Sequence, residues 1–291
     1  MYTMKIMTAD APAHRSQAAL EDALHALLER DKPRRVVVVT GAGISAESDI
    51  PTFRGAQGYW TVGAKEYHPE QLAKLEAFED MPREVWHWYL YRKGICNAAE
   101  PNAAHRALAE LEAALGDDFC LITQNVDGLH LRAGNSLART LQVHGNTDYM
   151  RPIEGDSTPI PIPADIPPQA KDDPISDAHW ARLHTSDGRP TRPHVLWFDE
   201  CYNESLYRAD SALEAAQSCD LLIVIGTSGA AAIPYHAAAA ALQNGALFID
   251  INLEENPFQE KAREREAVGR GLWLRGSSSL WMPKIVARLV G

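Results

Sequence analysis

The sequence has few cysteines, and no two of them have the close spacing of a metal site. The 291 residues include only Cys96, Cys120, Cys201 and Cys219, and no two of these form a C-x-x-C pair. A tetrahedral cysteine zinc site therefore cannot be built from short paired spacings. Four widely separated cysteines in a chain of this length predict free thiols in a reducing compartment rather than a disulfide framework.

Positive charge and long apolar runs are also scarce. Lysine and arginine total 28 against 39 aspartates and glutamates, which gives a net charge of −11. A general nucleic-acid binder needs a cationic face, so we expect no nucleic-acid partner. Residues 1–17 lack the apolar core of a signal peptide, and the richest apolar stretch, 230–242, is too short and too alanine-rich to span a bilayer. We therefore expect no membrane association and a cytoplasmic location.

Buried-type strand patterns alternate with helical patterns along most of the chain. Apolar or β-branched runs typical of buried parallel strands occur at 35–40, 119–124, 140–144, 221–225 and 246–252. Helical patterns occur at 16–30, 103–115, 211–218 and 230–242, and another helix is expected to begin at Ile44. This alternation predicts an α/β protein with a Rossmann-like, doubly wound parallel sheet that helices cover on both faces.

Two segments depart from the alternation. Residues 61–97 are rich in aromatic side chains and have a helical pattern, whereas eight of the 18 prolines lie between residues 145 and 191. A proline-rich stretch of this kind is typical of irregular structure. We predict a Rossmann-like domain and a smaller inserted lobe, partly helical and partly irregular. The predicted domain comprises residues 16–60, 98–146 and 192–291, and the predicted lobe comprises residues 61–97 and 147–191.

A glycine-rich turn follows the first predicted strand. The segment TGAGISA at residues 40–46 fits the pattern G-x-G-x-x-A between a strand and a helix. Such glycines allow a tight turn and a close approach to a pyrophosphate, whose charge the helix N-terminus favours. A plain strand–helix turn is the alternative, but the context favours dinucleotide binding. The acidic residue expected about 20 residues later is missing, because residues 51–60 do not resemble a strand. Arg54 in that glycine-rich loop is a candidate phosphate ligand.

Polar residues follow two further predicted strands. Gln124, Asn125 and Asp127 lie at the carboxyl end of the strand at 119–124, where open α/β sheets bind ligands. They suit recognition of a ribose or an amide, although such residues also cap loops. His144 ends the next predicted strand and is a candidate general base. Taken alone, it would more often be a packed core histidine.

In this order, the segments GAGIS, IPTFRG, TQNVDGLH and HG resemble the motifs of the sirtuins, the NAD-dependent protein lysine deacylases. The later segments RPHVLWF, IGTS and INL agree with the same family. The resemblance covers about residues 16–290. It implies NAD as the cofactor, a Rossmann-like NAD-binding domain, and acylated lysine side chains of proteins as the partner.

The resemblance also implies a role for the residues of each motif. It assigns Gly41, Ala42, Gly43, Ser45 and Arg54 to the diphosphate; Gly226, Thr227 and Ser228 to phosphate and ribose; Asn252 with Leu253 to the adenosine ribose; Gln124 to the nicotinamide ribose; and Ile50, Asn125 and Asp127 to the nicotinamide. Phe53 would shield the reacting carbon, and His144 would be the general base.

The same likeness implies the reaction. The acyl-lysine oxygen attacks a ribose carbon as nicotinamide leaves, and His144 then draws a proton from a ribose hydroxyl that attacks in turn. The products are nicotinamide, free lysine and O-acyl-ADP-ribose. The enzyme contributes orientation and a water-poor tunnel.

Tyr89 and Arg92 match the Tyr-x-x-Arg pattern of sirtuins that remove succinyl, malonyl or glutaryl groups. These acyl groups end in a carboxylate, which a guanidinium and a nearby phenol can bind. Residues three apart on a helix share one face, so the two side chains can act together. The alternative is an aromatic core helix with a solvated arginine. Acetyl groups are a further candidate for removal.

The sequence departs from the family pattern in three places. Most sirtuins carry two C-x-x-C pairs between the catalytic histidine and RPHV, but residues 145–191 contain no cysteine, and His179 and His184 lack thiolate partners. We therefore expect no metal, and packing of Ile160, Ile162 and Trp180 in place of the zinc lobe. Asp49 and Asp199 stand where the family usually has glycine. The segment containing Val195, Trp197 and Phe198 is expected to pair with the substrate backbone, where the charge of Asp199 would favour a cationic partner.

Other functions stay open on the sequence. One alternative is an ADP-ribosyltransferase or an NAD hydrolase on the same fold, and neither of these activities needs an acyl pocket. The presence of Asn125, Asp127 and His144 together with the Tyr89 and Arg92 pair favours deacylation over these two activities. A nucleotide-sensing protein without turnover is a further alternative, and it is less favoured because His144 is present.

Overall fold

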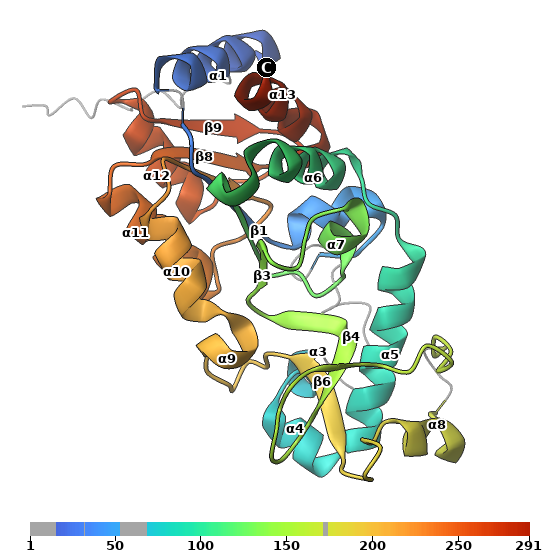
Figure 1. Ribbon diagram of the computed structural model, residues 1–291. Helices are drawn as coiled ribbons and strands as arrows, with labels where there is room; N and C mark the ends of the chain where they lie inside the picture. Colours follow the sequence, from blue (N-terminus) through green and yellow to red (C-terminus); the bar gives the residue numbers. More distant parts are fainter. Residues whose placement is uncertain (1–15, 32, 53–68, 171–173) are drawn as a thin grey trace, which may run out of the picture.

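Six parallel strands form the main sheet of the computed structural model, which describes residues 16–31, 33–52, 69–170 and 174–291 (Figure 1). The strand order is β3-β2-β1-β7-β8-β9. The strands are β1 (Val36–Thr40), β2 (Phe119–Thr123), β3 (Thr140–Gln142), β7 (Leu221–Ile225), β8 (Leu247–Asn252) and β9 (Gly271–Arg275). The order reverses between β1 and β7, as in doubly wound dinucleotide-binding sheets, so the predicted fold class is confirmed.

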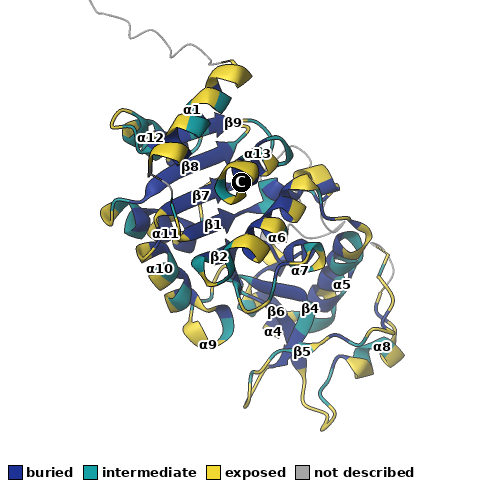
Figure 2. Ribbon diagram, turned by 45° about the horizontal axis from the view of Figure 1, so that its top comes forward, coloured by how far each residue is buried: buried dark blue, intermediate teal, exposed yellow. Residues whose placement is uncertain are grey.

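Helices cover both faces of this sheet (Figures 1 and 2). On one face lie α1 (Gln17–Asp31), α6 (Ala103–Leu115) and α13 (Ser278–Val290), and on the other lie α10 (Ala209–Gln217), α11 (Ala232–Gln243) and α12 (Pro257–Glu266). Val36 and Val38 of β1 pack into the first layer, whereas Val37 and Val39 pack into the second. An all-apolar strand such as VVVVT fits this position, because both of its faces are buried.

A second sheet lies beside the first and has the order β5-β4-β6, with antiparallel pairing. Its strands are β4 (Gly145–Pro152), β5 (Ile160–Pro161) and β6 (Thr191–Val195). Around it lie α3 (Pro69–Leu72), α4 (Leu75–Asp80), α5 (Pro82–Ala98) and α8 (Asp177–Arg182). The shorter elements η1 (Ala42–Ser48), η2 (Gly116–Asp118), α7 (Leu129–Ala133) and α9 (Glu204–Tyr207) connect the larger ones.

The second sheet has an aromatic core of its own. Trp86, Trp88 and Trp197 are buried in it, and so is Ile162 from the proline-rich segment. Ile160 and Trp180 are partly buried against the same cluster, so the packing expected for this segment is confirmed. None of the helices in the described part of the chain has the length and apolar character needed to cross a bilayer.

The structure corrects several element predictions. Residues 145–152 form strand β4 instead of irregular structure, because pairing with β6 outweighs a sequence, GNTDYMRP, with few strand-forming residues. The helix expected from Ile44 is the short 3-10 helix η1, and β3 ends before His144. Strand β6 pairs with β4 rather than with the main sheet, although 192–195 were assigned to the larger domain. The proposed division into domain and lobe otherwise stays a prediction.

Gly145 is a position where the backbone leaves no room for a side chain. Its φ is +84°, and an added Cβ would lie 2.1 Å from the His194 carbonyl oxygen across the β4–β6 pair. Gly188 has the same φ of +84°, but nothing lies within 4 Å of the position of its Cβ. Substituting alanine at Gly188 tests only the strain of the backbone conformation, whereas the same substitution at Gly145 also introduces a steric clash.

We expect Gly145→Ala to lower the free energy of unfolding by about 3 kcal/mol or more, because the β4–β6 pair must separate. Gly188→Ala should cost only about 1 kcal/mol, the strain of a left-handed alanine. Urea unfolding of both variants measures the difference. Equal losses would show that the close approach at Gly145 is not a constraint on the fold.

Candidate functional site

A cavity of about 640 Å³ opens at the carboxyl ends of β1, β2, β7 and β8 and extends to the second sheet. This volume lies in the range of pockets that hold small-molecule ligands. The predicted site residues that line it are Gly41, Ala42, Gly43, Tyr89, Arg92, Gln124, Asn125, His144, Val195, Trp197, Phe198, Gly226, Thr227, Ser228, Asn252 and Leu253. The structure therefore brings together residues from motifs that are more than 200 positions apart.

Three of the predicted site residues that the structure describes are not among the lining. Ser45, Ile50 and Asp127 lie behind the cavity wall, where Ser45 bonds to both of the others: its hydroxyl donates to Asp127, and its carbonyl accepts from the Ile50 N–H at 3.4 Å. Phe53 and Arg54 lie outside the described residues, so their roles stay predictions.

The two glycine turns pack backbone against backbone. The N–H of Gly43 donates to the Gly226 carbonyl at 2.8 Å, and the N–H of Gly41 donates to the Ile225 carbonyl at 2.9 Å. An added Cβ on Gly43 would lie 2.7 Å from the Gly226 Cα. Gly226 itself has a φ of +58°. In this structure the glycines thus allow β1 and β7 to end side by side, which adds to the role the sequence suggested for them.

Three polar side chains from three strand ends form one network. The Gln124 amide donates to the Thr227 hydroxyl at 3.0 Å and to the Thr40 carbonyl at 3.2 Å. The Asn252 amide donates to the Thr227 carbonyl at 3.0 Å. The network holds groups that suit ribose hydroxyls at the carboxyl edge of the sheet, where the sequence predicted them.

The Ser45 hydroxyl connects the residues predicted for the nicotinamide pocket. It donates to Asp127 Oδ2 at 2.8 Å and accepts from the Asn125 amide at 3.1 Å. Burial raises the pKa of Asp127 above its ordinary value, while the Leu129 N–H and the Ser45 hydroxyl oppose that rise. Asn125 and Asp127 are 8% and 6% exposed, so their orientation is fixed by these bonds.

Asp49 occupies a left-handed backbone position. Its φ is 61° and its ψ is 21°, and it ends η1. A glycine adopts this conformation without strain, and aspartate is one of the few other residues that tolerate it. The turn into Ile50 is therefore kept although the residue differs from the family pattern.

His144 lies directly after β3, half-buried in the cavity wall. Its Nδ1 is 3.1 Å from the Gln124 carbonyl oxygen, and its Nε2 is 2.7 Å from the Tyr202 hydroxyl. A carbonyl only accepts, so Nδ1 carries the proton and Nε2 is the basic atom. Burial lowers the pKa of His144 to about 4, although the bond to the carbonyl opposes this. The imidazole is therefore neutral at pH 7, as a general base requires.

Tyr89 and Arg92 line the end of the cavity next to the second sheet. Both side chains are 3% exposed, and the Arg92 guanidinium lies over the Trp88 ring at 4.7 Å and over the Tyr89 ring at 5.6 Å. The Trp197 indole N–H donates to the Tyr89 oxygen at 2.9 Å. Burial raises the pKa of Tyr89 to about 12, so its hydroxyl keeps a proton to donate. The alternative of a solvated arginine on a core helix is therefore wrong.

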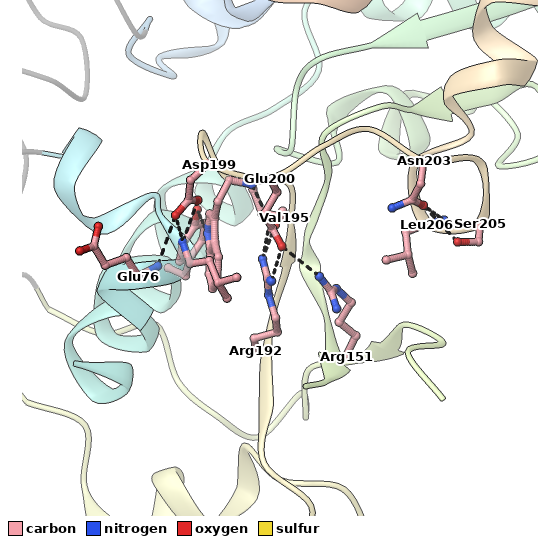
Figure 3. A network of polar contacts seen from close by, with 12 residues as sticks. Glu76, Arg151, Arg192, Val195, Asp199, Glu200, Asn203, Ser205 and Leu206 are labelled. Carbon is pink, nitrogen blue, oxygen red and sulfur yellow. Dashed lines mark hydrogen bonds and ion pairs between the residues drawn. The ribbon is translucent and has the colours of Figure 1, made fainter. Parts of the chain in front are cut away.

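Glu200 lies between Arg192 and Arg151 in an ion-pair network (Figure 3). Arg192 donates to both oxygens of Glu200, at 2.5 and 2.7 Å, and its guanidinium lies 3.5 Å from the centre of the Trp197 ring. Arg151 lies 3.6 Å from the same carboxylate, which also accepts the Trp197 backbone N–H at 2.9 Å. Glu200 therefore holds the backbone of Trp197 and, through Arg192, its ring.

The Asp199 carboxylate caps the N-terminus of the neighbouring helix α4 (Figure 3). Its carboxylate accepts the N–H of Leu75 at 2.8 Å and the N–H of Glu76 at 3.3 Å. These are N–H groups that the first turn of a helix cannot pair internally. Asp199 is exposed as well, so the expectation that its charge favours a cationic partner stays a prediction.

The segment expected to pair with a substrate backbone begins in an edge strand of the second sheet. Strand β6 is last in its sheet, so one side of it has no strand partner among the described residues. The three N–H groups that follow it are already bonded. Leu196 donates to the His144 carbonyl, Trp197 to Glu200, and Phe198 to the Ala73 carbonyl. A substrate strand would therefore have to bind through carbonyl oxygens here.

The described residues do not fit a structural zinc. No group of three or more His, Cys, Asp or Glu side chains suited to a metal occurs in this part of the chain. His184 Nδ1 lies 3.1 Å from the Trp180 carbonyl, and His179 is partly buried on α8. Zinc prefers four thiolate or imidazole ligands, and no cysteine lies between 145 and 191.

Tyr202 and Glu200 are site residues that the sequence analysis missed. Both line the cavity, and both lie in the irregular segment between β6 and α9. No periodic pattern marks this segment, and the partners of Tyr202 and Glu200 lie on other elements. Only the position of the segment directly after RPHVLWF pointed to it.

Comparison with known proteins agrees with this site. The model of the Sir2 family matches residues 41–232. An NAD-dependent protein deacylase of Leptospira interrogans is 36% identical over 265 residues, which cover 90% of this chain and 95% of that protein. One of Deinococcus radiodurans is 40% identical over 253 residues, covering 83% and 93%. The crystal structure of a Sir2 homologue in complex with NAD superposes with a TM-score of 0.70 at 32% identity, covering 95% of this chain and 94% of the other.

The Glu200 network gives a stability prediction. Glu200→Gln removes the negative charge between two buried guanidinium groups, so we expect the free energy of unfolding to fall by about 3–5 kcal/mol. The matched control is Asp165→Asn, because Asp165 also binds an arginine, Arg182, through both oxygens but on the surface. An exposed pair contributes little, so the control should unfold almost like the parent protein. A similar loss in both variants, measured by urea unfolding, would contradict the supporting role of Glu200.

Proposed function

The chain belongs to the Sir2 family, and from this membership we propose that it is an NAD-dependent protein lysine deacylase that prefers acyl groups ending in a carboxylate. The observation that carries the proposal is the buried Tyr89 and Arg92 pair, which lines the same cavity as His144. An acyl-lysine that enters this cavity has a neutral base at one end and a cation at the other.

The residues present suit NAD. Bound NAD supplies a ribose carbon that reacts with the acyl oxygen and a nicotinamide that leaves. Gln124, Thr227 and Asn252 offer amide and hydroxyl groups to its riboses, and the turns at Gly43 and Gly226 leave the carboxyl edge of the sheet open to its phosphates. Asn125 orients the nicotinamide from the cavity wall, and the Ser45 hydroxyl holds Asn125 in place.

The acyl preference follows from the cost of a buried charge. A guanidinium that is 3% exposed holds its charge away from bulk water, and a carboxylate suits it because its two oxygens can accept from two N–H groups. The Tyr89 hydroxyl keeps its proton and adds a third donor. A succinyl or malonyl group brings the carboxylate, whereas an acetyl group places only a methyl near the cation.

We also propose that the lobe around the second sheet folds without zinc. Ile162, Ile166, Ile175 and Leu183 come from the segment where most sirtuins have the zinc cysteines, and all four are buried in the aromatic core. Apolar burial of this kind stabilises a small lobe without a metal.

The first experiment compares matched acetyl-lysine and succinyl-lysine peptides, with NAD and a zinc chelator in the assay. We expect release of free lysine peptide and nicotinamide from both peptides, with the higher kcat/KM for the succinyl peptide. A preference for acetyl would contradict the carboxylate proposal but leave deacylation standing. Nicotinamide release without any loss of acyl groups would instead favour the NAD hydrolase or transferase alternative. Loss of activity only when the chelator is present would contradict the zinc-free lobe.

The second experiment replaces Arg92. Arg92→Met removes charge-assisted hydrogen bonds to the carboxylate, so kcat/KM for the succinyl peptide should fall by about 100-fold. Arg92→Lys keeps the charge but lacks the planar fork, and should give an intermediate loss. The control is Arg83→Met, which removes an exposed arginine from the same helix, α5. An unchanged succinyl efficiency in Arg92→Met would refute the role of Arg92.

A further inference from the structure

The basic atom of His144 is already occupied by a phenol. Because the Gln124 carbonyl takes the Nδ1 proton, Nε2 has the one lone pair with which the imidazole can accept a proton. Tyr202 lies 2.7 Å from this atom, and its hydroxyl must be the donor because Nε2 carries no hydrogen. A ribose hydroxyl therefore cannot reach the lone pair of His144 while Tyr202 stays in place.

Packing holds Tyr202 in place as well as the bond to His144. Its ring packs against the apolar layer between the main sheet and helices α10 to α12. Moving the phenol away would disturb this packing and break the bond to His144.

The phenol oxygen of Tyr202 can accept a hydrogen bond from a ligand in the cavity. A phenol has one proton and two acceptor positions. The proton goes to His144, and no other hydrogen bond to the Tyr202 oxygen is found among the described residues, so an acceptor position stays open. Tyr202 and His144 both line the cavity that would hold NAD, together with Gln124 and Thr227. The open acceptor position is therefore available to a ribose hydroxyl.

We propose that Tyr202 is a catalytic residue that passes the ribose proton to His144, an inference that rests on the proposed deacylase function. The ribose O–H bond breaks as its proton moves to the Tyr202 oxygen, while the Tyr202 proton moves to His144 Nε2. The phenol is regenerated, the imidazole becomes imidazolium, and the ribose oxygen keeps the electron pair with which it attacks the acyl carbon.

The first test uses the protein without NAD. In ¹⁵N-labelled protein at pH 7, the Nε2 resonance of His144 should have the shift of a neutral nitrogen that accepts a hydrogen bond. In Tyr202→Phe, it should move toward the value of an unbonded neutral imidazole. His144→Ala identifies the resonance. An identical Nε2 shift in the parent protein and Tyr202→Phe would refute the contact on which the proposal depends.

The second test separates the step before proton removal from the step after it. Exchange of labelled nicotinamide into NAD, in the presence of acyl peptide, needs only the first reaction of the acyl oxygen. Formation of free lysine peptide also needs the ribose proton to be removed. In Tyr202→Phe we expect deacylation to fall by about 100-fold, the usual scale of general-base catalysis, while exchange persists. A merely structural role would lower both rates together.

Two further variants serve as controls. Tyr235→Phe removes an exposed phenol on helix α11 and should change neither rate. The double variant His144→Ala/Tyr202→Phe should deacylate no more slowly than His144→Ala, because the two residues act in one transfer. Full deacylation by Tyr202→Phe, or an added loss in the double variant, would refute the relay. If the parent protein itself shows no acyl-dependent exchange, the proposed function fails instead.

Discussion

The close approach of the turns after β1 and β7 is the constraint on which the site depends. Gly43 and Gly226 contact through their backbones, and the N–H of Gly226 continues the link to the Ile251 carbonyl at 3.0 Å. The ends of β1, β7 and β8 are thereby linked. Gln124, directly after β2, and Asn252, the last residue of β8, can then both bond to Thr227 beyond the end of β7. A side chain at either glycine would separate the strand ends and open this network.

A second constraint couples the lobe around the second sheet to the cavity. Glu200 binds Arg192 and the Trp197 backbone, and Trp197 in turn donates to Tyr89. The end of the cavity at Tyr89 is thus positioned by the ion pair of Glu200 and Arg192. Such a pair adds little net stability, because burying the charges costs about as much as their attraction returns. What it provides is a fixed orientation for the indole, and hence for the phenol beside Arg92.

The sequence predicts the parts of this structure whose signal is local. Strands such as LLIVI are apolar on both faces, and a strand followed by glycines marks a ligand edge. The sequence therefore predicted the strands of the main sheet except β9, and many of the predicted site residues line one cavity. Strand β4 was missed because its residues form a strand only through pairing with β6. Tyr202 was missed for a similar reason, since it lies 58 positions from His144 in a segment without periodicity. A contact of that length leaves no local pattern.

Burial sets the protonation of the site as a whole. It lowers the pKa of His144 to about 4 and raises the pKa values of Tyr89 and Tyr202 to about 12. The base is therefore neutral and both phenols are protonated across the physiological range. In such surroundings the cost of ionising a group without a partner is large. The proposed relay avoids that cost at the phenol, because Tyr202 gains one proton as it gives up another. Arg92 cannot lose its charge in this way. The proposed carboxylate of the acyl group would therefore contribute what no change in protonation within the wall can supply.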